Sequence, residues 1–141
     1  MMNREGLNSS EIEAPVGPFS HVVRAGDLLY ISGQTGQRSH TGTPIGNDIA
    51  EQTTQIFENL KAVLRTVNCD LSHIVKVTVF LTNIDDFAAM NAVYAHYFDL
   101  PYPARSTIAV KALPLGALVE VECIAKVEDE NTSDGSERPS L

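Results

Sequence analysis

The sequence is poor in the residues that build covalent and metal-held scaffolds. It has two cysteines, Cys69 and Cys123, no tryptophan and four histidines in 141 residues. The cysteines are too few and too far apart for a disulfide framework or a zinc cluster, so we expect two reduced, structural thiols. No pair of histidines has HxH or HExxH spacing, and we therefore expect no metal site.

Cofactor motifs and membrane segments are missing as well. The sequence has no phosphate-binding loop and no strand–GxGxxG–helix fingerprint, so chemistry with a nucleotide cofactor has no support, and it has no GxSxG nucleophile elbow either. No apolar run approaches the length of a membrane span, and residues 1–14 lack the apolar core of a signal peptide. These absences favour a cytoplasmic protein that has no membrane partner.

Basic residues are scarce relative to acidic ones. Ten lysines and arginines stand against 18 aspartates and glutamates, which gives a net charge of −8. The acidic excess lies mainly at the ends, since residues 128–141 carry −4 and residues 14–127 only −2. Without a basic patch or a run of lysine and arginine, nucleic acid is a poor candidate for the main partner.

Composition divides the chain into three parts. Residues 1–13 are polar and aperiodic, which predicts a flexible N-terminal arm. Residues 128–141 are acidic and lack apolar anchors, which predicts a disordered tail. Residues 14–127 are long enough to form one domain around one core.

Apolar periodicity within residues 14–127 predicts the element order ββαβαββ. Asp48 with Glu51 three residues later is a capping box, so the first helix should begin there. The expected strands cover 21–24, 28–32, 73–82, 105–111 and 118–127, and the expected helices cover about 48–67 and 87–98. We expect an α+β fold with a mixed sheet and two helices on one face.

The sheet face that the helices leave open should be part apolar and part charged. Alternation over 73–82 assigns the odd-numbered residues to the core and places Ile74 and Phe80 on the opposite face. Glu120 and Glu122, two residues apart on the last strand, should share that face. A face of this mixed kind often lines an oligomer interface.

Arg105 and Glu120 are the candidate catalytic residues. An arginine offers a planar fork of donors to a carboxylate, and a partly desolvated glutamate can move protons to or from water. The plain alternatives are a pairing of Arg105 with Asp99 and of Glu120 with a lysine on its own face. If the last two strands formed a simple hairpin, the two residues would lie about 13 Å apart. Either these strands are not neighbours, or the site joins two subunits.

Two further positions are candidate ligand contacts. Ser32 and Gly33 end a predicted strand where a glycine allows a ligand to approach backbone N–H groups, although such a sequence is more often only a turn. Asn91 lies on the second predicted helix, from which its amide can reach a ligand or solvent.

Several segments together resemble the RidA/YjgF family of enamine and imine deaminases, over about residues 14–127. The most specific are Pro103-Ala104-Arg105-Ser106 and Glu120-Val121-Glu122. Gly17-Pro18, Ile31-Ser32-Gly33-Gln34, the strand at 75–80 and Asn91-Ala92-Val93-Tyr94 follow the family pattern in the same order.

This resemblance implies a chorismate-mutase-like fold and a homotrimer with its clefts between subunits. The matching arginine, Arg105, would hold the carboxylate of a 2-imino acid, and Glu120 would position the attacking water. The products would be a 2-oxo acid and ammonia, formed without a cofactor. The Gly33 N–H would assist with the carboxylate, and Ser32 and Asn91 would shape the cleft.

Two residues depart from the family pattern. Phe19 stands where many members have a tyrosine, and Thr107 stands where many have a cysteine. Both would line the cleft, so they bear on substrate range and rate. The alternatives are a trimer that binds small carboxylates without turnover and a deaminase of larger enamines such as 2-aminomuconate. Ribonuclease activity, known for relatives, fits poorly with a body charge of −2.

Overall fold

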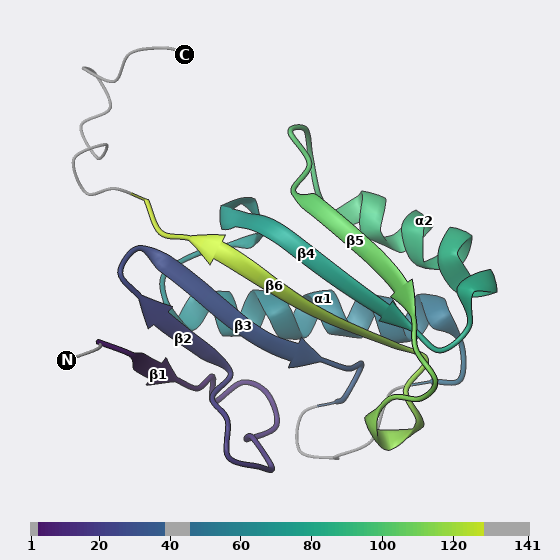
Figure 1. Ribbon diagram of the computed structural model, residues 1–141, viewed down its shortest axis with the longest axis horizontal. Helices are drawn as coiled ribbons and strands as arrows, with labels where there is room; N and C mark the ends of the chain where they lie inside the picture. The colour runs from purple at the N-terminus through teal and green to yellow at the C-terminus, as the bar shows by residue number, and fades with distance from the viewer. Residues whose placement is uncertain (1–2, 39–45, 129–141) are drawn as a thin grey trace.

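The protein folds as a layer of helices on a single sheet. The computed structural model describes residues 3–38 and 46–128, and Figure 1 shows both helices behind the sheet. The strands are β1 Glu5–Leu7, β2 Val22–Ala25, β3 Leu28–Gln34, β4 Ile74–Leu81, β5 Ala104–Ala109 and β6 Val119–Lys126. The helices are α1 Ile49–Thr66 and α2 Phe87–Tyr97, with short 3-10 turns at Leu71–His73, Ile84–Asp86 and Pro114–Gly116. The α+β prediction is confirmed.

The sheet has the order β1-β2-β3-β6-β4-β5. Every neighbouring pair is antiparallel except β4 and β5, which are parallel, so the sheet is mixed as predicted. The last strand of the chain, β6, lies in the middle between β3 and β4 (Figure 1). Because β6 lies in the middle of the sheet, alternate side chains along it are buried under the helices. The residues between them must therefore point to the opposite face.

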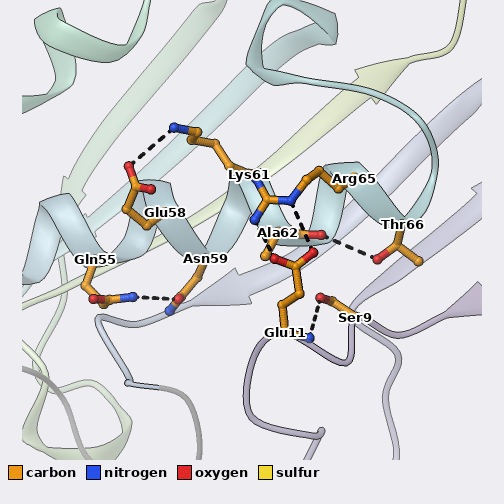
Figure 2. A network of polar contacts seen from close by, with 9 residues as sticks. All are labelled: Ser9, Glu11, Gln55, Glu58, Asn59, Lys61, Ala62, Arg65 and Thr66. Atoms are coloured by element: carbon orange, nitrogen blue, oxygen red, sulfur yellow. Dashed lines mark hydrogen bonds and ion pairs between the residues drawn. The ribbon is translucent and has the colours of Figure 1, made fainter.

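The N-terminal segment differs from the expected flexible arm over 1–13. Strand β1 pairs antiparallel with β2, so the element order gains a strand at its start. Ile12 is buried in the core, and Glu11 forms a two-bond ion pair with Arg65 of α1 (Figure 2). Contacts with residues distant in the sequence therefore order this segment, although its own sequence has no apolar periodicity that predicts a strand. Of the predicted tail, residues 129–141 lie outside the described residues.

Helix α1 begins where the capping box predicts. The Asp48 side chain accepts a hydrogen bond of 2.8 Å from the Glu51 N–H, which satisfies one of the free donors of the first turn. Ile56, Leu60 and Val63 recur on one face and are fully buried against the sheet. The helix therefore covers the half of the sheet formed by β3 and β6.

Strand β4 departs from simple alternation at its first residues. The register with β6 shifts between Ile74 and Lys76, so Val75 occupies a bulge. Ile74 is consequently buried and Val75 is 47% exposed, the reverse of the prediction for these two positions. From Val77 onward the predicted phase holds, since Val77, Val79 and Leu81 are fully buried.

Strands β5 and β6 do not form a hairpin. Strand β5 pairs in parallel with β4 at the sheet edge, and β4 separates it from β6. The sequence left two possibilities, that the strands carrying Arg105 and Glu120 are not neighbours or that the site joins two subunits. The structure confirms that the two strands are not neighbours.

Candidate active site

Arg105 lies on the helix side of the edge strand β5. It is in register with Val77, which points into the core, so the Arg105 side chain leaves the sheet toward α2. Its guanidinium carbon lies 4.6 Å from the centre of the Tyr94 ring and 5.5 Å from that of Phe87. Cation–π attraction to two rings from one helix restricts the arginine to a few conformations.

A hollow of about 420 Å³ opens beside the Arg105 guanidinium. Its other lining residues are Asn91, Tyr94, Ala95, Tyr102 and Pro103. Arg105 forms no ion pair with Asp99 or with any other acid of residues 3–38 and 46–128, so the plain structural alternative is not observed. A cation held by aromatic rings and lacking an acidic partner is suited to bind an anion from outside the chain.

Thr107 points to the same face as Arg105, two residues along β5. Its hydroxyl oxygen is buried and has no hydrogen-bond partner among the described residues, and the same holds for the Tyr94 hydroxyl. The Arg105 side of the candidate site thus contains two hydroxyl groups whose bonding capacity the described chain leaves unused.

Glu120 lies near the start of β6 on the open face of the sheet. Its neighbours in sequence, Val119 and Val121, are fully buried, so alternation points the carboxylate away from the helices. Burial raises the pKa of the Glu120 carboxyl above its ordinary value, and the negative charge of Glu122 adds to this rise. A carboxylate whose pKa is raised is a stronger base than an ordinary glutamate and so accepts a proton from water more readily.

The Glu120 carboxylate lies directly over the backbone of Gly33. A Cβ at Gly33 would overlap the carboxylate and come within 2.9 Å of Glu120 Cδ, so a larger residue at position 33 would push the Glu120 side chain aside. The register between β3 and β6 shifts from Ile31 to Gln34, which places Ser32 and Gly33 in a bulge. The alternative pairing of Glu120 with a lysine on its own face is not observed in residues 3–38 and 46–128, where Lys126 pairs with Asp27 and Lys76 donates to a serine hydroxyl.

Ser32 and Phe19 belong to the same end of the molecule as Gly33. The Ser32 hydroxyl donates a 2.7 Å hydrogen bond to the carbonyl oxygen of Ser20, so it fixes the segment that contains Phe19 against β3. The Phe19 side chain is 48% exposed, which leaves its ring available to another surface.

The candidate residues therefore form two groups on opposite faces of one sheet. Arg105, Thr107 and Asn91 lie on the helix side, whereas Glu120 and Gly33 lie on the open side. Val77 of β4 pairs with Arg105 on one side and with Cys123 of β6 on the other, so Arg105 and Cys123 lie two strands apart. Cys123 is three residues along β6 from Glu120. These steps correspond to about 14 Å between the two Cα atoms, with the side chains directed apart. One chain does not bring Arg105 and Glu120 together.

Phe87, Tyr94 and Tyr102 are site residues that sequence reasoning missed. Helical spacing predicts a core position for both Phe87 and Tyr94, which is correct for Tyr94, 6% exposed and packed against Phe57, whereas Phe87 is 37% exposed. The available signal was their spacing from Asn91, since positions 87, 91 and 94 share one face of a helix. Tyr102, between Pro101 and Pro103, had no periodic pattern that could reveal it.

No group of three or more histidines, cysteines, aspartates or glutamates lies close enough to hold a metal ion in residues 3–38 and 46–128. Within the same residues, no helix is both long and apolar enough to cross a membrane.

Comparison with known proteins identifies related sequences and structures along most of the chain. The family model described as Endoribonuclease L-PSP matches residues 10–127. A 2-iminobutanoate/2-iminopropanoate deaminase of Dermatophagoides farinae is 40% identical, over 81% of this chain and 89% of its own. The crystal structure of RidA from a Psychrobacter species has a TM-score of 0.83 at 36% identity, covering 87% of this chain and 99% of that one. The structure of Escherichia coli TdcF with bound serine has a TM-score of 0.82 at 31% identity, covering 88% and 99%.

Proposed function

This chain belongs to the RidA/YjgF family, and from that membership we propose that it hydrolyses reactive 2-imino acids to 2-oxo acids and ammonia. Water adds to the imine carbon and gives one proton to the nitrogen, and the resulting hydroxyl gives the second proton as the carbon–nitrogen bond breaks, so that a 2-oxo acid and ammonia leave. The observation that carries this proposal is Arg105, a cation at the wall of an open hollow that has no acidic partner within the described part of the chain.

Arg105 holds the substrate carboxylate in this mechanism. Its planar fork donates two parallel N–H bonds, which fix both the position and the direction of the imine. The Phe87 and Tyr94 rings keep the guanidinium in place before the substrate arrives. Binding therefore costs little conformational entropy of Arg105, and the imine carbon is held in a fixed orientation for attack.

Glu120 is the proton carrier in this mechanism. It carries a proton from the attacking water to the nitrogen and then a second proton from the new hydroxyl to the departing nitrogen, and its raised pKa makes the carboxylate a stronger base for both transfers. Backbone groups in the bulge at Gly33 lie beside the Glu120 carboxylate and are placed to contact the same substrate.

The site requires two subunits, because Arg105 and Glu120 occupy opposite faces of the sheet. We propose a homotrimer in which the open face of one subunit meets the α2 edge of the next, a head-to-tail contact that closes into a ring. Tyr30, Val75 and Ile108 are large apolar side chains exposed by nearly half on the open face or its edges. Their burial would favour assembly. A monomeric variant should accordingly have no active site.

The test is ammonia release from a 2-imino acid generated in situ by an amino-acid oxidase. Arg105→Ala should lower kcat/KM at least about 30-fold, which corresponds to about 2 kcal/mol for a lost bidentate contact. Arg24→Ala is the matched control, because Arg24 is exposed on β2 and its side chain donates to the Gly26 carbonyl oxygen in the neighbouring turn. Equal rates for Arg105→Ala and Arg24→Ala would contradict the mechanism. A 2-oxo acid that raises the melting temperature while no imine is hydrolysed would support a binding protein instead.

A further inference from the structure

Helix α1 carries a buried amide that bonds to the strand bearing Glu120. Gln52 is 3% exposed, and its Oε1 accepts a 2.9 Å hydrogen bond from the Leu118 N–H. Its Nε2 donates to the Gly46 carbonyl oxygen at 3.4 Å. A buried glutamine loses water at both ends of its amide, so these two contacts are the reason it is stable there.

Leu118 is the residue at which β6 becomes anchored. Its carbonyl oxygen accepts from the Thr82 N–H at 3.1 Å, so Gln52 and the end of β4 together hold both of its backbone groups. Pairing of β6 with β3 begins only at Val121, whereas pairing with β4 begins at Val119. Glu120 therefore lies on a stretch of β6 that a strand supports on one side only, two residues from the Gln52 contact.

The same part of α1 also holds the chain that follows Gly33. Gly36 packs against the helix so closely that a Cβ there would come within 2.8 Å of the Gln52 carbonyl oxygen. Asn59 donates to the carbonyl oxygens of Thr35 and Gln37. Gln55 in turn donates to Asn59, as Figure 2 shows. One helix thus fixes both backbone segments between which the Glu120 carboxylate lies.

We propose that Gln52 is a positioning residue for Glu120, setting where the carboxylate lies over the Gly33 backbone. Gln52 touches neither the carboxylate nor the hollow, and it acts through the Leu118 N–H. The catalytic consequence rests on the proposed deaminase function, whereas the effect on Glu120 itself does not.

The decisive variant is Gln52→Met, which keeps the length of the side chain and removes both hydrogen bonds. Thr53→Val is the matched control, because Thr53 is fully buried one position away and its hydroxyl has no partner among the described residues. In the ammonia assay, Gln52→Met should lower kcat about tenfold with KM within about twofold, since Arg105 is untouched. Thr53→Val should keep both constants within about twofold of wild type.

Two readouts separate positioning from a loss of stability. The pH–rate profile of Gln52→Met should shift, because the environment of Glu120 changes, and a purely structural role would leave it unmoved at temperatures where the variant is folded. The Glu120 carboxyl can also be titrated by carbon-13 NMR, with Glu120→Gln identifying its signal. Its midpoint should lie above that of an ordinary glutamate in wild type and move in Gln52→Met but not in Thr53→Val.

The outcomes distinguish the two proposals. An unmoved Glu120 midpoint in Gln52→Met, together with an unchanged pH–rate profile, overturns the positioning role even if the melting temperature falls. A moved midpoint in a protein that releases no ammonia keeps the positioning role and rejects the deaminase. If Gln52→Met does not fold, Gln52→Asn withdraws the amide by one methylene while keeping it polar, and the same titration decides.

Discussion

Mixing two inactive variants is the sharpest test of a site shared between subunits. Arg105→Ala removes the helix-side half, and Glu120→Ala removes the open-side half. Their Cα atoms are about 14 Å apart and their side chains point away from each other, so neither half can be completed within one chain. Each variant alone should be inactive, whereas a mixed oligomer should recover activity.

The size of the recovery follows from the closed ring. In the proposed trimer each interface would take Arg105 from one subunit and Glu120 from the next, so an interface is intact only when the first subunit retains Arg105 and the second retains Glu120. With equal amounts and random mixing, about a quarter of the interfaces meet this condition. The assay is ammonia release after the two variants are unfolded, mixed and refolded together, set against wild type treated in the same way.

The control mixes Arg105→Ala with the double variant that lacks both residues. That mixture contains no Arg105, so its activity should stay at the level of Arg105→Ala alone. If the mixture of single variants is no more active than this control while mixed oligomers are present, the site does not lie between subunits. The proposed division into two half-sites would then be wrong.

Three other predictions follow from local geometry. Gly33→Ala should lower kcat at least about tenfold in the ammonia assay, because its Cβ would displace the Glu120 carboxylate. Phe19→Tyr should change the ranking of substrates in a panel of short and long imines and enamines, including 2-aminomuconate, and an unchanged ranking would place Phe19 outside the cleft. The third concerns His21, whose pKa is held below its usual range by burial and whose Nδ1 accepts from the Ser9 N–H. The unfolded chain therefore binds the proton first, so the melting temperature should decline as pH falls below about 6.5, and His21→Gln should remove that component.

Local features of the fold could be predicted and long-range ones could not. The β2–β3 hairpin follows from Gly26, which has a φ of +66° in the turn, and the start of α1 follows from Asp48. Strand β1 has three residues and no alternation, so only its pairing with β2 defines it. The bulge at Val75 reverses two positions because it depends on the register with a strand some 50 residues later.

The candidate site shows the same division. Arg105 and Glu120 stand out by chemistry and by resemblance, and both stay candidates in the structure. The rings around Arg105 did not stand out, because Phe87 and Tyr94 have the spacing of core residues and their contact with β5 is tertiary. Gln52 gave no signal either, since a glutamine in the first turn of a helix is ordinarily solvated.

The central position of β6 is the reason why the proposed site would be a property of the assembly. Because Val119 and Val121 must enter the core, the pleat directs Glu120 to the open face, and no side-chain rotation returns it to the Arg105 side. A shift of β6 by one residue would reverse the faces, but it would also expose the buried valines and bury Glu120 and Glu122. The core therefore enforces the separation of the two half-sites. A sequence with this core can complete the pair of Arg105 and Glu120 only by bringing a second copy of the chain against its open face.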